Sequence, residues 1–257
     1  MATQYPGTLL GSDDPAPVIV FNPDRPSPFL LIGDHAGIAI PAALGTLGLK
    51  PHHLARHIAS DIGVRGLGEA LALRLDCGFI HQAYSRLVID CNRDPASPEA
   101  IPDVSDGTVI PGNHHLDPAQ VQARIAEIHE PYQAAIADEI ARRTADGHIT
   151  VLVALHSFTS TLQGVARPWH AGVLHNGGDE SFACAVLNEL RKEPELTIGD
   201  NLPYHMDMTD HSVPRHAFAA GLPYVELEIR QDLLADAAGQ RHWSEILATA
   251  LIGALAG

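Results

Sequence analysis

The chain has few cysteines, few basic residues and no long hydrophobic run among its 257 residues. Its three cysteines, Cys77, Cys91 and Cys184, are too few and too scattered for a disulfide framework or a thiolate metal cage. No run of about 18 uncharged apolar residues occurs, so a membrane-spanning helix is not expected. A basic start followed by an apolar stretch is also missing, and we expect no signal peptide. Together these absences predict a soluble, cytoplasmic protein.

Acidic residues outnumber basic ones, with 31 Asp and Glu against 16 Lys and Arg and a formal net charge of −15. Phosphate binding needs a basic surface, so this charge argues against a nucleic-acid partner. It does not exclude an acidic small substrate, because one or two buried arginines can override the distant field within a pocket. The sixteen histidines supply imidazoles from which a metal site or a proton-transfer site can be built.

The length suits one large α/β domain, and no internal repeat or long linker is present. Residues 1–16 are rich in Gly, Pro and Asp and predict a loose lead-in. Short apolar runs then alternate with helical patterns, as is typical of an α/β fold. Most runs are continuously apolar, which predicts strands covered on both faces. The predicted strands are 18–21, 29–33, 78–81, 87–90, 149–155, 171–174, 197–199 and 224–229.

Helices are predicted at about 60–75, 117–146, 179–192, 211–220 and 241–256. In the second, Asp117 is a plausible N-cap with Pro118 at the first helical position. Pro131 predicts a kink inside this helix, because proline removes a backbone donor and crowds the preceding turn. The segment 95–116 has several Pro, Gly and Asp and no periodicity, so it predicts a long loop of the kind that often serves as a lid.

Polar residues stand at the ends of three predicted strands. Asp34 and His35 follow the strand 29–33, His156 and Ser157 follow 149–155, and Glu226 and Glu228 share one face of 224–229. A single histidine in such a place is commonly bonded to a nearby carbonyl group. Two of them from separate strands, with carboxylates nearby, favour a metal instead. Zinc binds imidazole and carboxylate ligands, and catalytic zinc keeps one position for water.

The segment from Ser85 to Arg93 suits the binding of a carboxylate. Guanidinium groups such as those of Arg86 and Arg93 can hold a carboxylate through two parallel hydrogen bonds, and the Asn92 amide can add another. The alternative is a surface arginine paired with Asp90 or Asp94.

Several short motifs together resemble the N-formylglutamate amidohydrolase family. Their order and spacing, over roughly residues 30–233, carry the resemblance. The motifs are Asp34-His35-Ala36-Gly37, Ser60-Asp61-Ile62-Gly63, Ser85 to Arg93, Leu155-His156-Ser157, Asn201-Leu202-Pro203-Tyr204 and Glu228-Ile229-Arg230-Gln231-Asp232-Leu233. The family is related to the zinc carboxypeptidases and aspartoacylases. The resemblance therefore implies a three-layer α/β/α fold with a mixed, mostly parallel sheet, and one catalytic zinc.

The resemblance implies His35 and His156 as two metal ligands. The carboxypeptidase relatives place a carboxylate three residues after the first histidine, where this chain has Ile38. Asp61 matches the first Asp of the family's Asp-Thr-Asp segment and is the predicted third ligand, although Gly63 replaces the second Asp. Asp34 and Asp90 are the alternatives for this ligand.

The resemblance also implies that Asn92 and Arg93 contact a substrate carboxylate and that Glu228 is the catalytic glutamate. Its neighbour Glu226 corresponds to a position that is often a neutral amide in the family. Asp34 stands where the family usually has Pro, and Ala36 where it usually has Ser. These departures affect substrate identity more than reaction type.

The hypothesis from the sequence is a zinc-dependent hydrolase that cleaves the amide bond of a small N-acyl acidic amino acid, with N-formyl as one possible acyl group. A catalytically inactive metal-binding or carboxylate-binding protein of the same fold is the alternative. A serine hydrolase using Ser157 is a third possibility, disfavoured because adjacent residues rarely align as nucleophile and base and no Gly-x-Ser-x-Gly motif is present.

The remaining polar clusters are expected to be structural or solvated. His52-His53 and His114-His115 fall in loops or helix starts. His175 begins a flexible turn that could border the pocket. Asp210, His211 and Ser212 resemble a helix start, with a substrate-contacting loop as the alternative.

Overall fold

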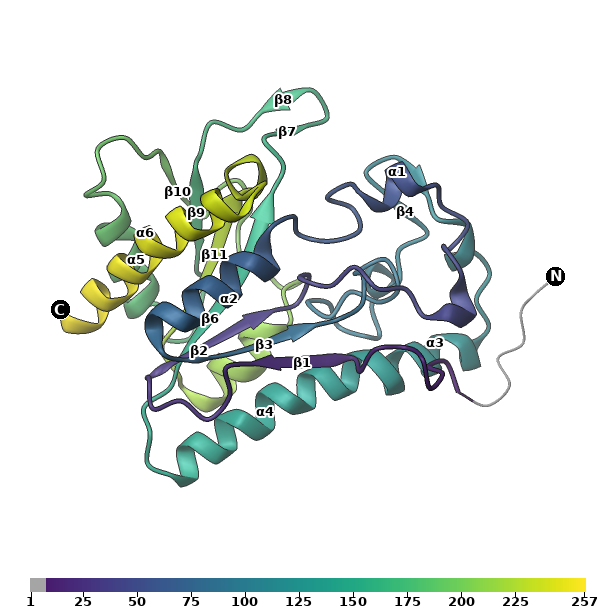
Figure 1. Cartoon of the computed structure of the whole chain (residues 1–257), viewed down its shortest axis with the longest axis horizontal. Coiled ribbons are helices and arrows are strands. Elements are labelled where there is room, and N and C mark those ends of the chain that lie inside the picture. Colours follow the sequence, from purple (N-terminus) through teal and green to yellow (C-terminus); the bar gives the residue numbers. More distant parts are fainter. Residues whose placement is uncertain (1–7) are drawn as a thin grey trace.

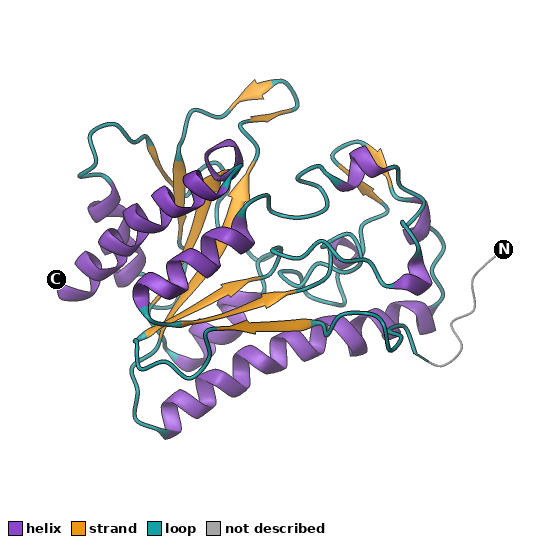
Figure 2. Ribbon diagram, viewed as in Figure 1, coloured by secondary structure: helices purple, strands orange, loops and turns teal. Residues whose placement is uncertain are grey.

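The protein, described here by a computed structural model for residues 8–257, has three layers, with a central sheet between two groups of helices (Figure 1, Figure 2). The seven-stranded sheet has the order β1-β3-β2-β6-β11-β9-β10. The β1–β3 and β11–β9 pairs are antiparallel and the other pairs are parallel. The predicted mixed, mostly parallel α/β/α fold is thus confirmed. The strands are β1 (Val18–Phe21), β2 (Phe29–Gly33), β3 (Gly78–Gln82), β6 (Val151–Phe158), β9 (Ala171–Leu174), β10 (Ile198–Asp200) and β11 (Tyr224–Arg230).

Helices cover both faces of the sheet. The helices α2 (Val64–Leu75), α5 (Ser181–Leu190) and α6 (Ala237–Ala256) pack on one face. On the other face lie α4 (Glu130–Ala145) and the π-helical segment Pro214–Phe218, and Figure 1 shows α4 running beneath the sheet. Shorter helical elements are η1 (Ala42–Leu44), α1 (Pro51–Leu54) and η6 (Gln231–Leu234).

Alternate residues of the strands enter two separate cores. In β2, Leu31 packs against the helices α2, α5 and α6, whereas Leu30 and Ile32 pack toward α4. Successive side chains of a strand point to opposite faces, so a strand buried on both sides has no polar face. By the same alternation, His156 of β6 and Glu228 of β11 point to the α4 side.

The predicted helix 117–146 forms, in three parts. α3 (Pro118–Arg124) begins at Asp117, whose side chain accepts a hydrogen bond from the Gln120 backbone N–H. A π turn at Ile125–His129 then leads into α4, and the Glu130 N–H donates to the Ile125 carbonyl, five residues back. Pro131 has no N–H to give to a carbonyl four residues back. The sequence predicted a kink at this proline, and the structure has a π turn immediately before it.

The predicted strand at 87–90 is wrong. The backbone turns there, because the Val88 N–H donates to the Ser85 carbonyl and the Leu87 N–H to the Ser85 hydroxyl. The side chains of Leu87, Val88 and Ile89 fill a third core. A short apolar run therefore predicts burial without identifying the backbone conformation that buries it.

Two predicted loops are more ordered than expected. The segment 95–116 contains the 3-10 turns Pro98–Ala100 and Pro111–Asn113 and the hairpin of β4 (Val104–Ser105) and β5 (Thr108–Val109). The lead-in 1–16 is not loose where it is described: Leu9 is buried, and the N–H groups of Leu9 and Leu10 donate to the Glu127 carboxylate. Residues 1–7 lie outside the described part of the chain.

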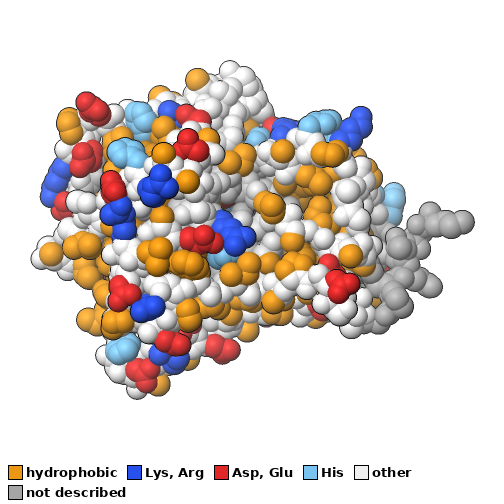
Figure 3. All heavy atoms as spheres, in the orientation of Figure 1, with side chains coloured by type: hydrophobic (Ala, Val, Ile, Leu, Met, Phe, Trp, Pro, Cys, Tyr) orange, Lys and Arg blue, Asp and Glu red, His pale blue; other side chains and the backbone are white. Residues whose placement is uncertain are grey.

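A further hairpin, not predicted from the sequence, joins β6 to β9. It consists of β7 (Thr161–Leu162) and β8 (Val165–Ala166) and projects beyond the sheet at the top of Figure 1. Within residues 8–257, no helix has the length and apolar character needed to span a bilayer. The face in Figure 3 carries basic and acidic side chains interspersed, with no continuous basic area.

Candidate active site

Polar residues gather where three neighbouring strands end. His35 follows β2, while His156 and Glu228 lie near the ends of β6 and β11. These strands are parallel neighbours, so their carboxyl ends meet at one edge of the sheet. They border a cavity of about 420 Å³. Its walls include His35, Asp61, Arg86, Asn92, Arg93, His156, Ser157, Phe158, Tyr204, Asp207, Asp210, Glu226 and Glu228.

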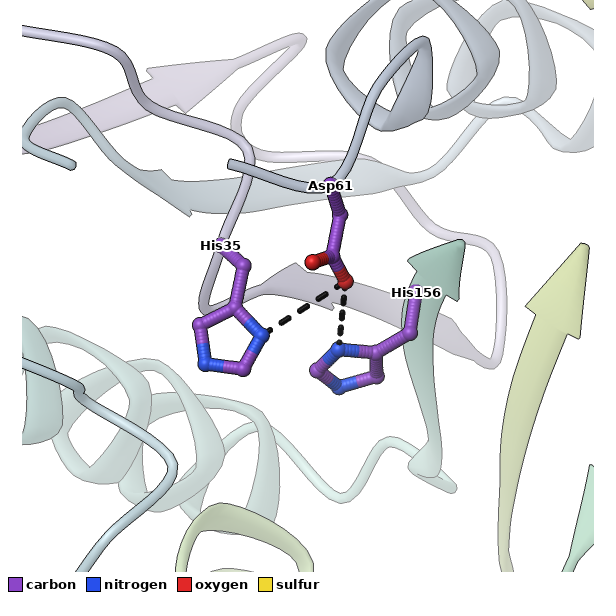
Figure 4. Close-up of side chains that lie close together, drawn as sticks. All are labelled: His35, Asp61 and His156. Carbon is purple, nitrogen blue, oxygen red and sulfur yellow. Dashed lines mark hydrogen bonds and ion pairs between the residues drawn. The ribbon is translucent and has the colours of Figure 1, made fainter. Parts of the chain in front are cut away.

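His35, Asp61 and His156 all line the cavity, and the structure brings their side chains together (Figure 4). All three are buried, and one potential ligand atom of each lies within 4.8 Å of the others. Asp61 Oδ2 lies 3.5 Å from His35 Nδ1 and 3.0 Å from His156 Nδ1. Both imidazoles therefore point a ring nitrogen at the same carboxylate oxygen.

These distances fit a tetrahedral metal ion. Zinc bonds of about 2.0–2.1 Å at tetrahedral angles place neighbouring ligand atoms roughly 3.3 Å apart. The two distances to Asp61 Oδ2, 3.0 and 3.5 Å, bracket that separation. His35 Nδ1 is also buried without a hydrogen-bond partner among the described residues, which is the condition of a ligand atom without its ion.

A carboxylate lies behind each histidine ring. Asp90 Oδ1 is 2.6 Å from His35 Nε2, and Asp34 Oδ2 is 3.5 Å from His156 Nε2. A carboxylate that hydrogen-bonds to a metal-binding histidine fixes the orientation of its ring, as Asp90 does for His35. Asp34, by contrast, lies beside His156 Nε2 without a hydrogen bond to it. The alternatives for the third ligand, Asp34 and Asp90, thus lie on the far side of the rings from Asp61.

The protein alone stabilises charge at this centre. Burial lowers the pKa of His35. The Asp90 and Asp61 carboxylates raise it by more than burial lowers it, so the pKa is raised overall. For His156, burial again lowers the pKa, while Asp34 and Asp61 carry it well above the ordinary value. The raised pKa values mean that both rings readily carry an extra proton. A metal ion bound at Asp61 Oδ2 would displace these protons, because imidazole ligands must be neutral.

Glu226 and Glu228 point into the cavity from β11. Glu228 pairs in register with His156, and Glu226 lies two residues earlier on the same side of the strand. Both are buried, and the Oε2 atom of each has no hydrogen-bond partner within residues 8–257. Burial raises the pKa of both carboxyls, against a lowering effect of His156. Asp61 and Arg86 also act on the pKa of Glu228, and Asp210 and Asp34 on that of Glu226.

Arg86 is bound to the carboxylates around the centre. Its guanidinium donates to Asp90 Oδ2 at 2.7 and 3.1 Å and to Asp61 Oδ1 at 3.3 Å. The pairing with Asp90 that the sequence suggested as an alternative does occur, but in the cavity wall and not on an open surface. Arg86 holds Asp61 and Asp90 in place on either side of His35.

Asn92 and Arg93 face the cavity with most of their polar atoms already engaged. Asn92 Oδ1 accepts from the backbone N–H groups of His211 and Ser212, and Asn92 Nδ2 donates to Asp210 Oδ1 at 3.2 Å. Arg93 Nη1 donates to the Asn92 carbonyl and lies 3.6 Å from Asp210 Oδ1. His211 and Ser212 therefore begin a helical segment that Asn92 caps, as the helix-start interpretation predicts. Asp210 lines the cavity, as the substrate-contacting alternative predicts.

The other polar residues named from the sequence do not form a second centre. The Ser157 hydroxyl donates to the Ile62 carbonyl at 3.0 Å, and Ser157 and His156 point to opposite faces of β6, which does not suit a nucleophile and its base. His175 lies between Glu180 and Asp200, away from the cavity. The pairs His52-His53 and His114-His115 do not line the cavity either.

Arg167, which the sequence did not indicate, lies next to two aromatic rings of the cavity wall, and this place is called the rim. It follows β8, and its guanidinium lies 4.6 Å from the ring centroid of Tyr204 and 5.9 Å from that of Phe158. Both rings line the cavity. The contact joins segments far apart in the chain, so no local spacing could have predicted it.

The fold and the site define a class: an α/β protein with a candidate His–Asp–His metal site and two buried glutamates at the carboxyl edge of its sheet. Sequence comparison then gives the family. The model of the N-formylglutamate amidohydrolase family matches residues 27–235, and the chain belongs to this family of hydrolases. The resemblance drawn from the motifs is confirmed.

Solved structures share the fold of this chain. The crystal structure of a gene product from Agrobacterium tumefaciens has a TM-score of 0.93 and 34% identity, over 96% of this chain and 98% of that chain. The N-formylglutamate amidohydrolase from Ralstonia eutropha JMP134 has a TM-score of 0.67 and 21% identity, over 94% of this chain and 98% of that chain, and shares the fold. No curated protein matches the sequence.

Proposed function

We propose that the chain is a zinc-dependent hydrolase that cleaves the amide bond of a small N-acyl acidic amino acid, with N-formylglutamate as the reference substrate. The observation that carries this proposal is the convergence of two histidine nitrogens on Asp61 Oδ2 beside the buried Glu228. The chain would act as one amidohydrolase-like domain, 1–257, in the cytoplasm. Its partner is the small substrate, and neither nucleic acid nor membrane is involved.

His35 Nδ1, Asp61 Oδ2 and His156 Nδ1 would hold the zinc ion, leaving one position open. When bound, zinc supplies a Lewis acid that polarises an amide carbonyl and lowers the pKa of water toward about 7. Asp90 keeps the His35 ring oriented, and Arg86 offsets part of the negative charge that three nearby aspartates contribute.

Glu228 moves the proton. Its carboxylate accepts a proton from the attacking water, whose oxygen stays on the carbonyl carbon. Glu228 then delivers that proton to the amide nitrogen as the C–N bond breaks, which releases a carboxylic acid and a free amino acid. The raised pKa of this buried carboxyl suits a group that must both take and give a proton near neutral pH.

Arg86, Asn92 and Arg93 are proposed to hold a substrate carboxylate so that the scissile carbonyl faces the centre. Arg86 and Arg93 present guanidinium groups to the cavity wall, and Asn92 lies between Arg93 and Asp210. Holding the substrate in one orientation replaces a random encounter with an aligned one, which raises the rate.

The test is hydrolysis of N-formyl-L-glutamate and N-acetyl-L-glutamate before and after chelation. The proposal expects activity that a chelator abolishes and added zinc restores. Activity insensitive to chelation and lost in Ser157→Ala would overturn it in favour of a serine hydrolase. Tight binding of acyl amino acids without any turnover would favour the inactive binding protein.

A further inference from the structure

Arg86 and Arg93, which are proposed to hold one substrate carboxylate, also pair with carboxylates of the protein. Arg86 pairs with Asp90 and Asp61, and Arg93 lies near Asp210 and Glu99. An N-acyl acidic amino acid brings two negative charges, one beside the scissile amide and one at the end of its side chain. A cavity that also holds buried carboxyls needs a further cation to accept the second charge.

Arg167 is such a cation. Within residues 8–257 it forms no ion pair, and its side chain makes one hydrogen bond, from Nη1 to the Tyr204 hydroxyl at 2.9 Å. Nε and Nη2 remain without an acceptor. Guanidinium binds a carboxylate best through two parallel N–H groups, and these atoms offer that geometry.

Aromatic rings hold the Arg167 guanidinium at the cavity rim. Tyr204 and Phe158 both line the cavity, and the guanidinium lies near both rings. Stacking on an aromatic face orients the guanidinium without neutralising its charge. The β7–β8 hairpin that precedes Arg167 continues from β6, so Phe158 lies two residues beyond His156. β6 continues into the β7–β8 hairpin (Figure 1), and Arg167 follows β8.

We propose that Arg167, supported by Tyr204, binds the side-chain carboxylate of the substrate and determines the preference for acidic over neutral amino acids. This inference rests on the proposed function. The carboxylate next to the scissile amide remains with Arg86, Asn92 and Arg93, close to the predicted ligands. The side-chain carboxylate extends outward to the rim, where the unpaired guanidinium lies.

The test compares N-formyl-L-glutamate with N-formyl-L-glutamine, which have nearly the same shape and differ by one carboxylate. Arg167→Gln is expected to lower kcat/KM for the glutamate substrate about 10–100-fold, mainly through KM, as is typical for loss of a hydrogen bond to a charged group. The value for the glutamine substrate should change little. Arg167→Lys should recover part of the preference, because it keeps the charge and loses the planar two-bond contact.

A matched control is Arg65→Gln, which changes an exposed arginine that pairs with Glu69 on α2. It should leave both substrates unaffected, and all variants should have similar melting temperatures. A loss in Arg167→Gln that is equal for both substrates, or an unchanged preference, would overturn the assignment.

Binding separates this inference from the proposed function. Calorimetric Kd values of zinc-loaded protein for L-glutamate and L-glutamine do not depend on turnover. If the wild type hydrolyses neither formyl substrate, the proposed function fails, and the Arg167→Gln effect on glutamate binding still decides the role of Arg167. If the wild type is active and Arg167→Gln keeps its preference for glutamate in both measurements, only the role of Arg167 fails.

Discussion

Two buried groups of charged residues in this protein differ in how well their polar atoms are satisfied. Arg143, on α4, is 1% exposed, and its three guanidinium nitrogens donate to Glu139 and to the carbonyls of Ser27 and Phe29. At the candidate metal site, His35 Nδ1 and Glu228 Oε2 are also buried and have no hydrogen-bond partner among the described residues.

The difference indicates what each group is for. Buried polar atoms in folded proteins are almost always hydrogen-bonded, so a fully satisfied cluster is explained by structure alone. A buried cluster with unmatched atoms that converge on one point instead needs a partner from outside the chain. Arg143 therefore ties α4 to the start of β2, and the centre around Asp61 is the candidate ligand-binding site.

The largest effect is expected from His156→Ala. The change removes a predicted ligand and with it everything that a bound metal supplies. Activity on N-formyl-L-glutamate should fall by more than about 10⁴-fold, beyond the loss of one proton-transfer group. Rates measured in zinc-supplemented buffer check this, and near-normal activity would remove His156 from the centre.

Glu228→Gln separates proton transfer from metal binding. The change is nearly isosteric, so zinc content and melting temperature should be kept while kcat falls about 10²–10⁴-fold. Glu226→Gln is the matched control, because Glu226 lies on the same face of β11 and is also buried. A larger loss in the Glu226 variant would exchange the roles of the two glutamates.

The gain in thermal stability on adding zinc should grow with pH. The pKa values of His35 and His156 are raised in the metal-free fold, so their stabilising effect is present below the unfolded value of 6.5 and is lost as the pH rises through the folded values. Zinc needs both rings neutral and must release their protons, which low pH opposes. Melting temperatures with and without zinc, between about pH 6 and about pH 8, should diverge as the pH increases. A constant difference would show that these rings do not bind the ion.

The smallest effect on catalysis is expected from Arg143→Met. Loss of this buried cation removes the donor to the Ser27 and Phe29 carbonyls, while Glu139 keeps Arg142 as a donor, so the free energy of unfolding should fall by about 1–3 kcal/mol. The kcat of the protein that remains folded should be nearly unchanged. Denaturant unfolding measures the loss of stability, and active-site titration gives the kcat of the folded protein. A selective loss of kcat would contradict a purely structural role for Arg143.

Most of the sheet was predictable because its strands are short, continuously apolar runs. The runs 18–21, 29–33 and 171–174 have the bounds of β1, β2 and β9. The same signal failed at 87–90, where side-chain to backbone hydrogen bonds of Ser85 stabilise a turn. An apolar run predicts that its side chains are buried. At 87–90 the backbone conformation depends on the neighbouring polar residue, Ser85.

The candidate site was predictable in its residues and not in its connections. His35 and His156 are indicated by their position after apolar runs, and Asp61 by resemblance to a family. The contacts of Asn92 with His211, and of Arg167 with Tyr204, join segments that no periodicity relates. Such pairings depend on tertiary structure and leave no spacing signal in the chain.

The central claim is that His35, Asp61 and His156 together hold a metal ion. The most direct measurement is the zinc content of wild-type protein and of Asp61→Asn, both loaded with zinc, desalted and analysed in parallel. The account predicts about one zinc per wild-type chain and almost none in Asp61→Asn, because the amide lacks the charge that both imidazoles converge on. Equal zinc content in the two proteins, or no zinc in either, would contradict it.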